Sequence, residues 1–344
     1  MSSGRHRKKN KNIIMYKRTK VYIYPPYKGK ILKTGNKYTQ LLWNSFEESP
    51  DFEIVNHRVI KKPFYDFIFN VDAKIFIFSW IESYAVSHLR MWKFLYILSF
   101  ILFLRLLNKK VVWIMHNKHP HLKSTKTTDW AMRTLAKVSK YVITHADEGV
   151  KHFEHHLNGR CGKCVFIPHP VYTDNLFESY PIKWDYIIWG NISPRKGIVE
   201  FLDYVKGDNY FADKKILICG KCGDKHYAQQ IEDSCSENIE FINDFISDGQ
   251  LREYIGSSAC ILFTYQESSI LSSGALVYSL NFCKPIIGPN VGSFSDMKGI
   301  VKCYDSFADI PNISLDSNTN SVKSYIRNNT WNLFPQKVKA IVQS

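Results

Sequence analysis

The sequence lacks a segment that could cross a membrane as a helix. Its longest apolar run extends from Phe94 to Leu104 and is interrupted only by Ser99, whereas a spanning helix needs about 20 apolar residues. Because the strand-like stretch Val111 to Met115 follows, the run predicts a buried helix that leads into a strand. The alternative is a helix that dips one face into a membrane surface. The basic residues that would then lie near lipid headgroups are Arg90, Lys93, Arg105, Lys109 and Lys110.

A secretory signal is also lacking ahead of the eight cysteines, so we expect reduced thiols and a cytoplasmic location, with the inner face of the cell membrane as a site of peripheral attachment. Four cysteines belong to a tetrapeptide that occurs twice, Cys161 to Cys164 and Cys219 to Cys222. Zinc is the alternative, but 54 residues separate the pairs where zinc ribbons use about 15 to 20. Cys219 also continues an apolar strand pattern. We therefore expect no bound metal.

Acidic residues are absent from the first 20 positions, which carry +8 of the formal net charge of +15 and leave +7 for the rest. A basic tail on a moderately basic body suits an anionic membrane surface, a phosphate-bearing substrate or nucleic acid, although a solvated tail is the simplest explanation. Met15 closely precedes the first predicted strand. A further hypothesis is therefore that residues 1–14 are an upstream extension, which mass spectrometry of the native N-terminus would test.

Repeats and low-complexity stretches are absent outside this tail, and a composition of 45% hydrophobic and 15% aromatic residues indicates a folded protein. The 344 residues exceed one comfortable hydrophobic core, which predicts two domains. Short apolar runs alternate with amphipathic segments, as in parallel sheets with crossover helices. The predicted units are a basic tail (1–20), an N-terminal Rossmann-like domain (21–172), a C-terminal Rossmann-like domain (185–317) and C-terminal helices (318–344).

The apolar runs define the expected strands of an α/β protein. In the first domain they are Val21 to Tyr24, Lys74 to Trp80, Val111 to Met115, Tyr141 to Thr144 and Val165 to Ile167. In the second they are Tyr186 to Trp189, Ile216 to Cys219, Ile239 to Ile242, Cys260 to Thr264, Pro285 to Ile287 and Ile300 to Cys303. Ligands bind beyond the carboxyl ends of such strands, so the residues that follow them are candidate site residues.

Polar residues gather after the strands of the first domain. They are Asn36 and Tyr38 after the first strand, His116, His119 and His121 after the third, and His145 after the fourth. Three histidines within six residues at such a place favour a binding cleft over core packing. A metal site would need further carboxylate or histidine ligands, which the sequence does not reveal.

Two turns in the second domain are suited to phosphate. Ser272 or Ser273 can cap a helix that begins at Gly274, and its small residues would expose backbone N–H groups at the positive end of the helix dipole. In the turn after Gly190 and Asn191, Ser193 and Pro194 open another helix, and Arg195 and Lys196 follow with two cations. Each turn alone is explained as an ordinary cap or a solvated charged turn, but together they predict a diphosphate site.

The ordered motifs resemble the two-domain GT-B glycosyltransferases, especially the family 4-like sugar transferases of bacterial polysaccharide assembly. The matching segments are Trp189 to Gly197, Ile216 to Gly220, Ser272 to Ile287, Val112 to His121 and Ile167 to Pro170. The resemblance implies two Rossmann-like domains facing across a cleft, with a C-terminal helix packing back on the first domain. It also implies transfer of a hexose-type sugar from a nucleotide diphosphate sugar to a lipid-linked or polysaccharide acceptor, with retention and without a metal or other cofactor.

Family roles can be carried over to matching positions. Lys196 and Arg195 would bind the donor phosphates, the backbone of Ser272 to Gly274 would cradle the diphosphate, and His116 would lie beside the donor sugar. Many members also have two glutamates eight positions apart, but this sequence has Ile270 and Tyr278 there. Glu267, three residues earlier, is the candidate replacement for the first, and Asn191 replaces a phosphate-binding arginine.

Three alternative functions stay open at this stage. The same fold could serve a nucleotide-sugar epimerase or hydrolase, and the missing glutamates are compatible with a catalytically inactive scaffold. The positive charge is compatible with a nucleic-acid-binding protein, but no recognised binding module is present. We therefore expect a nucleotide sugar, an oligosaccharide or lipid-linked acceptor and an anionic membrane surface as partners, and no nucleic acid.

Overall fold

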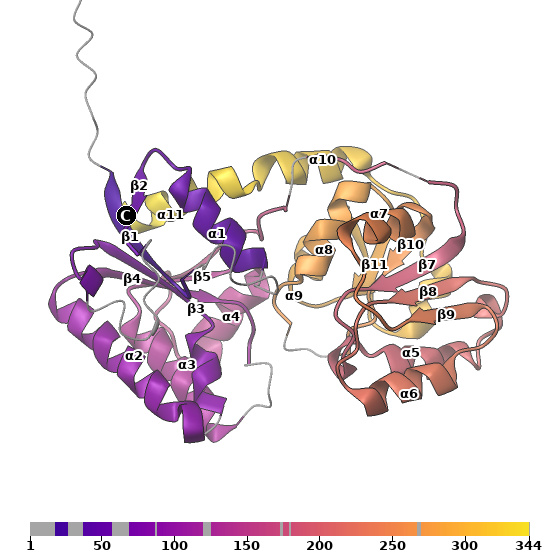
Figure 1. Ribbon diagram of the computed structural model, residues 1–344, viewed down its shortest axis with the longest axis horizontal. Coiled ribbons are helices and arrows are strands. Elements are labelled where there is room, and N and C mark those ends of the chain that lie inside the picture. Colours follow the sequence, from indigo (N-terminus) through magenta and orange to yellow (C-terminus); the bar gives the residue numbers. More distant parts are fainter. Residues whose placement is uncertain are drawn as a thin grey trace, which may run out of the picture.

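Two parallel six-stranded sheets, each flanked by helices, form the core of the computed structural model (Figure 1). The structure describes residues 18–26, 37–56, 69–86, 88–119, 125–172, 175–178, 180–266 and 270–343. Most of the predicted basic tail therefore lies outside the described residues. The predicted α/β class, with two Rossmann-like sheets, is confirmed.

The first sheet has the strand order β2-β1-β3-β4-β5-β6. Its strands are β1 (Thr19–Tyr24), β2 (Phe52–Ile54), β3 (Ile75–Ser79), β4 (Lys110–Met115), β5 (Tyr141–Thr144) and β6 (Cys164–Phe166). Its helices are α1 (Lys37–Glu47), the 3-10 helix η3 (Ile81–Val86), α2 (His88–Leu106), α3 (Lys126–Val138) and α4 (Asp147–His155). All residues of β3 are buried because helices cover both faces of the sheet. Strand β2 was not predicted, since three residues with an exposed Glu53 carry little periodic signal.

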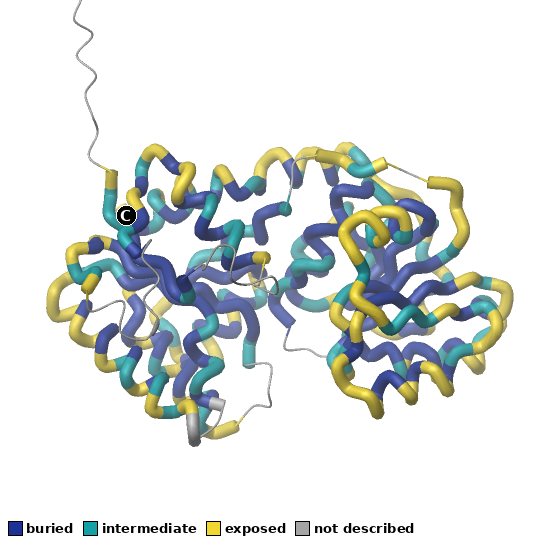
Figure 2. The backbone as a smooth tube through the Cα atoms, viewed as in Figure 1, coloured by how far each residue is buried: buried dark blue, intermediate teal, exposed yellow. Residues whose placement is uncertain are grey.

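The second sheet has the order β12-β11-β10-β7-β8-β9. Its strands are β7 (Trp184–Trp189), β8 (Ile216–Cys219), β9 (Ile239–Ile242), β10 (Ser258–Leu262), β11 (Ile286–Pro289) and β12 (Val301–Tyr304). Its helices are η4 (Pro194–Lys196), α5 (Ile198–Val205), η5 (Asn209–Phe211), α6 (Lys225–Ser234), α7 (Asp248–Gly256), α8 (Gly274–Ser279), η6 (Leu280–Phe282), α9 (Gly292–Asp296) and η7 (Phe307–Asn312). The strands are buried and the outer helix faces are exposed in both halves (Figure 2).

The C-terminal helices join the two halves across one side of the molecule (Figure 1). They are α10 (Thr319–Asn328), η8 (Trp331–Leu333) and α11 (Phe334–Gln343). Val322 and Ile326 of α10 belong to a core cluster of the second domain, whereas Phe334 and Val338 of α11 pack in the first. The C-terminal segment thus packs back on the first domain, as the resemblance implied.

Helix α2 has one buried and one exposed apolar face. Phe94, Ile97 and Ile101 are buried in the core of the first domain, which confirms the predicted core helix. Its outward side includes Trp92, 52% exposed, and Leu106, 85% exposed. In the described part of the chain, no helix is both long and apolar enough to cross a bilayer.

Candidate active site in the interdomain cleft

A cavity of about 350 Å³ lies between the two sheets, where carboxyl ends of strands from both domains meet. Its first-domain wall is formed by Tyr38, Trp80, His116, Asn117 and His169. Its other wall is formed by Tyr172 and by Gly190, Asn191, Ser193, Arg195, Lys196, Tyr265 and Ser272 to Ala275. The domains also touch directly beside it, because Asn117 and Ile270 form an isolated antiparallel bridge.

The start of α8 presents backbone rather than charge to the cavity. Ser273 caps the helix, and its Oγ accepts a hydrogen bond of 3.2 Å from the N–H of Leu276. The other N–H groups of a first turn have no acceptor within their own helix. Gly274 permits a close approach, since a Cβ there would lie 2.6 Å from Oη of Tyr172. This turn can therefore receive an anion through main-chain N–H groups.

The turn after β7 brings a buried cation to the same cavity. Lys196 is only 6% exposed, and its Nζ donates a hydrogen bond of 2.5 Å to the carbonyl of Trp189. The ammonium also lies 5.3 Å from the centroid of the Tyr265 ring. Gly190, with a φ of 105°, leaves room for it, because an added Cβ would lie 3.3 Å from Nζ. Both contacts are with neutral groups, so a phosphate in the cavity would supply the opposite charge.

The first-domain wall is a stack of aromatic and imidazole rings. His116 lies parallel to Trp80, with ring centroids 4.2 Å apart, and Tyr38 meets His116 edge-on at 4.7 Å. A flat, weakly polar wall of this kind suits the face of a sugar ring.

Buried hydrogen bonds hold this wall in place. Nδ1–H of His145 donates to the carbonyl of Ile167 at 2.8 Å, so its Nε2 accepts the 2.7 Å hydrogen bond from the Tyr38 hydroxyl. Burial, assisted by His169, lowers the pKa of His145 to about 3. Burial likewise lowers the pKa of His169 to about 4. Both imidazoles are therefore neutral at pH 7, and His145 positions Tyr38 from behind the cavity.

The structure separates the predicted site residues into three groups. Those that line one cavity are Tyr38, His116, Gly190, Asn191, Arg195, Lys196, Ser272, Ser273 and Gly274. Two that do not line it are His145, buried behind Tyr38, and His119, whose Nδ1 lies 3.6 Å from Oδ1 of Asp129. Those outside the described residues are Asn36, His121 and Glu267. The catalytic roles of His116 and Glu267 stay predictions.

Seven lining residues were not predicted as site residues, namely Trp80, Asn117, His169, Tyr172, Ser193, Tyr265 and Ala275. Trp80 directly follows β3, whereas Tyr265 follows the strand predicted over 260–264 and His169 lies three residues after β6. Applying the strand-end rule to every predicted strand would have found Tyr265 and His169, whereas Trp80 was predicted to be the last residue of its strand and only the observed end of β3 at Ser79 places it beyond that strand.

The two positions at which many GT-B family 4 members have glutamates are occupied here by Ile270 and Tyr278, neither of which is acidic in the way a carboxyl group is. Ile270 is buried at the domain contact. Tyr278 is also buried, with its ring centroid 5.4 Å from that of Trp189. It lines a neighbouring cavity of about 480 Å³, together with Lys37 and Arg252. Within the described ranges, no three His, Cys, Asp or Glu side chains are grouped as metal ligands.

No family model and no curated protein matches the sequence, but solved structures match the fold. HepE from Anabaena, in complex with UDP-glucose, superposes with a TM-score of 0.67 at 10% identity, covering 94% of this chain and 99% of that chain. A glycosyltransferase from Rickettsia africae gives a TM-score of 0.60 at 15% identity, covering 94% and 97% of the two chains. The lipopolysaccharide outer core galactosyltransferase WaaB gives 0.57 at 11%, covering 94% and 99%.

Two Rossmann-like domains that face each other across a cleft define the GT-B fold. At identities of 10% to 15%, the solved structures show the fold and leave the activity to be argued from the site. This chain has the GT-B fold found in HepE and WaaB.

Proposed function

We propose that the protein is a glycosyltransferase that moves a hexose-type sugar from a nucleoside diphosphate donor to an acceptor bound by the first domain. The observation that carries the proposal is the single cavity in which two phosphate-suited turns face a wall of aromatic and imidazole rings. The HepE structures with UDP, glucose and UDP-glucose support a nucleotide sugar as the donor.

The proposed roles follow from the chemistry of the leaving group. Breaking the bond between sugar and diphosphate leaves negative charge on the diphosphate, which Lys196, Arg195 and the N–H groups at the start of α8 would stabilise. Because these groups already provide positive charge, we propose transfer without a metal. Tyr38 and His116 would contact the sugar from the opposite wall. Retention of anomeric configuration is the proposed outcome, by the resemblance described above.

The acceptor is proposed to be lipid-linked or a polysaccharide, bound while the enzyme is attached peripherally to a membrane. The exposed apolar side of α2 supports this attachment. Of the thirteen large hydrophobic side chains exposed in the described part of the chain, five are on α2 and a sixth, Leu107, directly follows it, so this helix carries a concentrated apolar surface.

Incubating the purified protein with a panel of nucleotide sugars, with and without lipid and oligosaccharide acceptors, tests the proposal. We expect nucleoside diphosphate release that depends on an acceptor. Equal release without any acceptor would instead indicate a hydrolase, and interconversion of the donor sugar would indicate an epimerase. No consumption of any donor under all conditions would contradict the proposal.

A further inference from the structure

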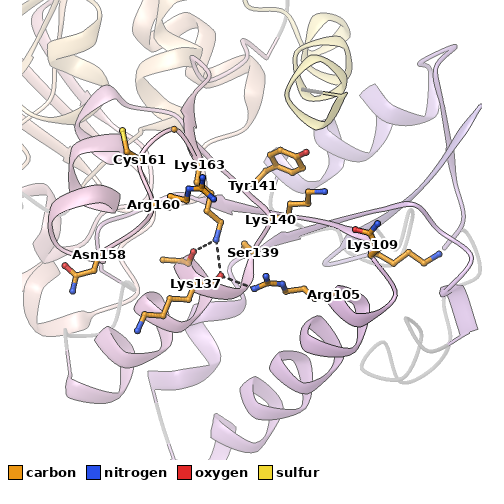
Figure 3. Close-up of a pocket in the computed structure, with 13 residues that line it drawn as sticks. Arg105, Lys109, Lys137, Ser139, Lys140, Tyr141, Asn158, Arg160, Cys161 and Lys163 are labelled. Carbon is orange, nitrogen blue, oxygen red and sulfur yellow. Dashed lines mark hydrogen bonds between the residues drawn. The ribbon is translucent and has the colours of Figure 1, made fainter.

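A second cavity, of about 760 Å³, shares no lining residue with the cleft and is strongly basic (Figure 3). Its basic lining residues are Arg105, Lys109, Lys137, Lys140, Arg160 and Lys163, and no carboxylate is among the other lining residues. Glu154 lies nearby, where it accepts a hydrogen bond of 3.4 Å from the N–H of Gly162. In the described ranges, none of the six cations forms an ion pair with a carboxylate.

This basic pocket is at the opposite edge of the sheet from the cleft. Its loops, which contain Lys109, Lys140 and Lys163, directly precede β4, β5 and β6. Because those strands are parallel, their amino ends share one edge, whereas the cleft is at their carboxyl ends. The pocket is therefore separate from the donor site.

Two of the cations are held at the carboxyl end of α3. Lys163 donates hydrogen bonds of 2.7 Å and 3.0 Å to the carbonyls of Ala136 and Lys137, and Arg105 donates one of 3.3 Å to the latter (Figure 3). Burial, together with Arg105 and Arg160, lowers the pKa of Lys163 to about 8. The helix end thus fixes two cations, and their mutual repulsion would be relieved by a bound anion.

Exposed apolar side chains adjoin these cations in the chain. Leu106, 85% exposed, directly follows Arg105, while Leu102 precedes it by three residues and so shares its side of the helix. A second hollow of about 270 Å³ on the same helix is lined by apolar and aromatic side chains that include Tyr96 and Phe103. A soluble phosphate compound would not need such a surface, whereas a phospholipid offers both an anion and acyl chains.

We infer that the basic pocket binds the phosphate headgroup of an anionic membrane lipid while the exposed apolar residues of α2 enter the adjoining acyl region. This inference rests on the peripheral membrane attachment proposed above. Helix α2 extends from the cleft edge of the sheet, after Trp80, to the pocket edge, before β4. A membrane along this helix would therefore also be close to the cleft, where a lipid-linked acceptor must enter.

Vesicle co-sedimentation of the full chain tests the inference. The probes are phosphatidylglycerol and phosphatidylcholine vesicles, and the variant combines Arg105→Gln, Lys137→Gln and Arg160→Gln. We expect wild-type protein to prefer phosphatidylglycerol and the triple variant to lose about 100-fold in partition coefficient, since each cation near an anionic surface contributes about fivefold. A matched triple variant on the exposed surface of the second domain, Lys206→Gln, Lys225→Gln and Arg327→Gln, is expected to change much less.

Two further measurements distinguish a lipid from other sources of phosphate: vesicle partition of a variant in the exposed apolar surface, and binding of a soluble phosphate compound. Leu106→Ser is expected to lower partition about tenfold, whereas the matched Leu315→Ser, 40% exposed in the second domain, is not. Equal vesicle binding by wild type and the pocket variant would overturn the inference. Binding of glycerol phosphate that the pocket variant loses, with unchanged vesicle partition, would overturn it in favour of a soluble ligand.

UDP affinity is measured on the same proteins. The pocket variants are expected to retain it, because the basic pocket is at the other edge of the sheet. Wild-type protein that binds vesicles through the pocket but never binds a nucleoside diphosphate would refute the proposed function alone. Pocket-independent vesicle binding with intact UDP binding would refute only the lipid site.

Discussion

Replacing Lys196 with alanine is the most direct perturbation of the donor site. The residue is 6% exposed, and one of its three side-chain N–H groups already donates to the carbonyl of Trp189. Two N–H groups are therefore available for phosphate oxygens. A charge-assisted hydrogen bond in a desolvated site contributes about 1.5 to 3 kcal/mol, which corresponds to a roughly 10- to 150-fold weaker binding of UDP.

Isothermal titration calorimetry with UDP and with uridine distinguishes loss of this contact from damage to the turn. Lys196→Ala is expected to weaken UDP and to leave uridine nearly unchanged, because uridine has no phosphate. Lys196→Met, which keeps most of the stem volume, should behave like the alanine variant, and Lys206→Ala, at the exposed position directly after α5, should not. Unchanged UDP affinity would refute the phosphate role. An equal loss for uridine would show that the turn itself had collapsed.

Three other predictions concern Gly274 in the cleft and buried titratable groups of the first domain. Gly274→Ala should weaken UDP binding and lower the free energy of unfolding by about 1 to 3 kcal/mol, because the added Cβ would lie 2.6 Å from Oη of Tyr172. Combining it with Tyr172→Phe, which removes that hydroxyl, should restore part of the lost stability. His145 and His169 have pKa values of about 3 and 4 in the folded protein, below the ordinary value, so the unfolded chain binds more protons in acid. Their contribution to the free energy of unfolding should therefore be fully present above about pH 6.5 and should decrease as the pH drops towards 4. The slope is up to about 1.4 kcal/mol per pH unit for each histidine. Burial raises the pKa of Glu82 to about 7, so its contribution to the free energy of unfolding is present at acidic pH and is lost as the pH rises. Glu82→Gln, which cannot ionise, should therefore raise the free energy of unfolding by about 3 kcal/mol at pH 8.

Denaturant unfolding between pH 4.5 and 8 checks the last two predictions, with the slope against pH as the readout. His145→Phe should reduce the acid-side slope by one proton even if it lowers stability at pH 7. A slope equal to that of wild type would contradict burial of a neutral His145. For Glu82→Gln, a stability difference that does not grow from pH 4.5 to pH 8 would show that the carboxyl is not protonated in the folded protein. The glycine prediction fails if Tyr172→Phe gives no relief.

The sequence by itself determined the strands and the phosphate-suited turns. Strands such as β3 and β4 are buried on both faces, so they are continuous apolar runs that can be recognised locally. The cap at Ser273 and the turn at Ser193 to Lys196 are also local, because capping depends on residues within one helical turn. The resemblance of these ordered segments to the GT-B glycosyltransferases then predicted the GT-B fold.

The tertiary structure decided which side chains reach the cleft. His116 and His119 are three residues apart, yet His116 stacks on Trp80 at the end of β3 and His119 lies beside Asp129 of α3, because each side chain packs against a different element. Strand β2 forms only through pairing with β1, since three residues have no periodic signal. Likewise, Arg105, Lys137 and Lys163 are scattered along the chain, and the shared amino-terminal edge of parallel strands brings them into one pocket.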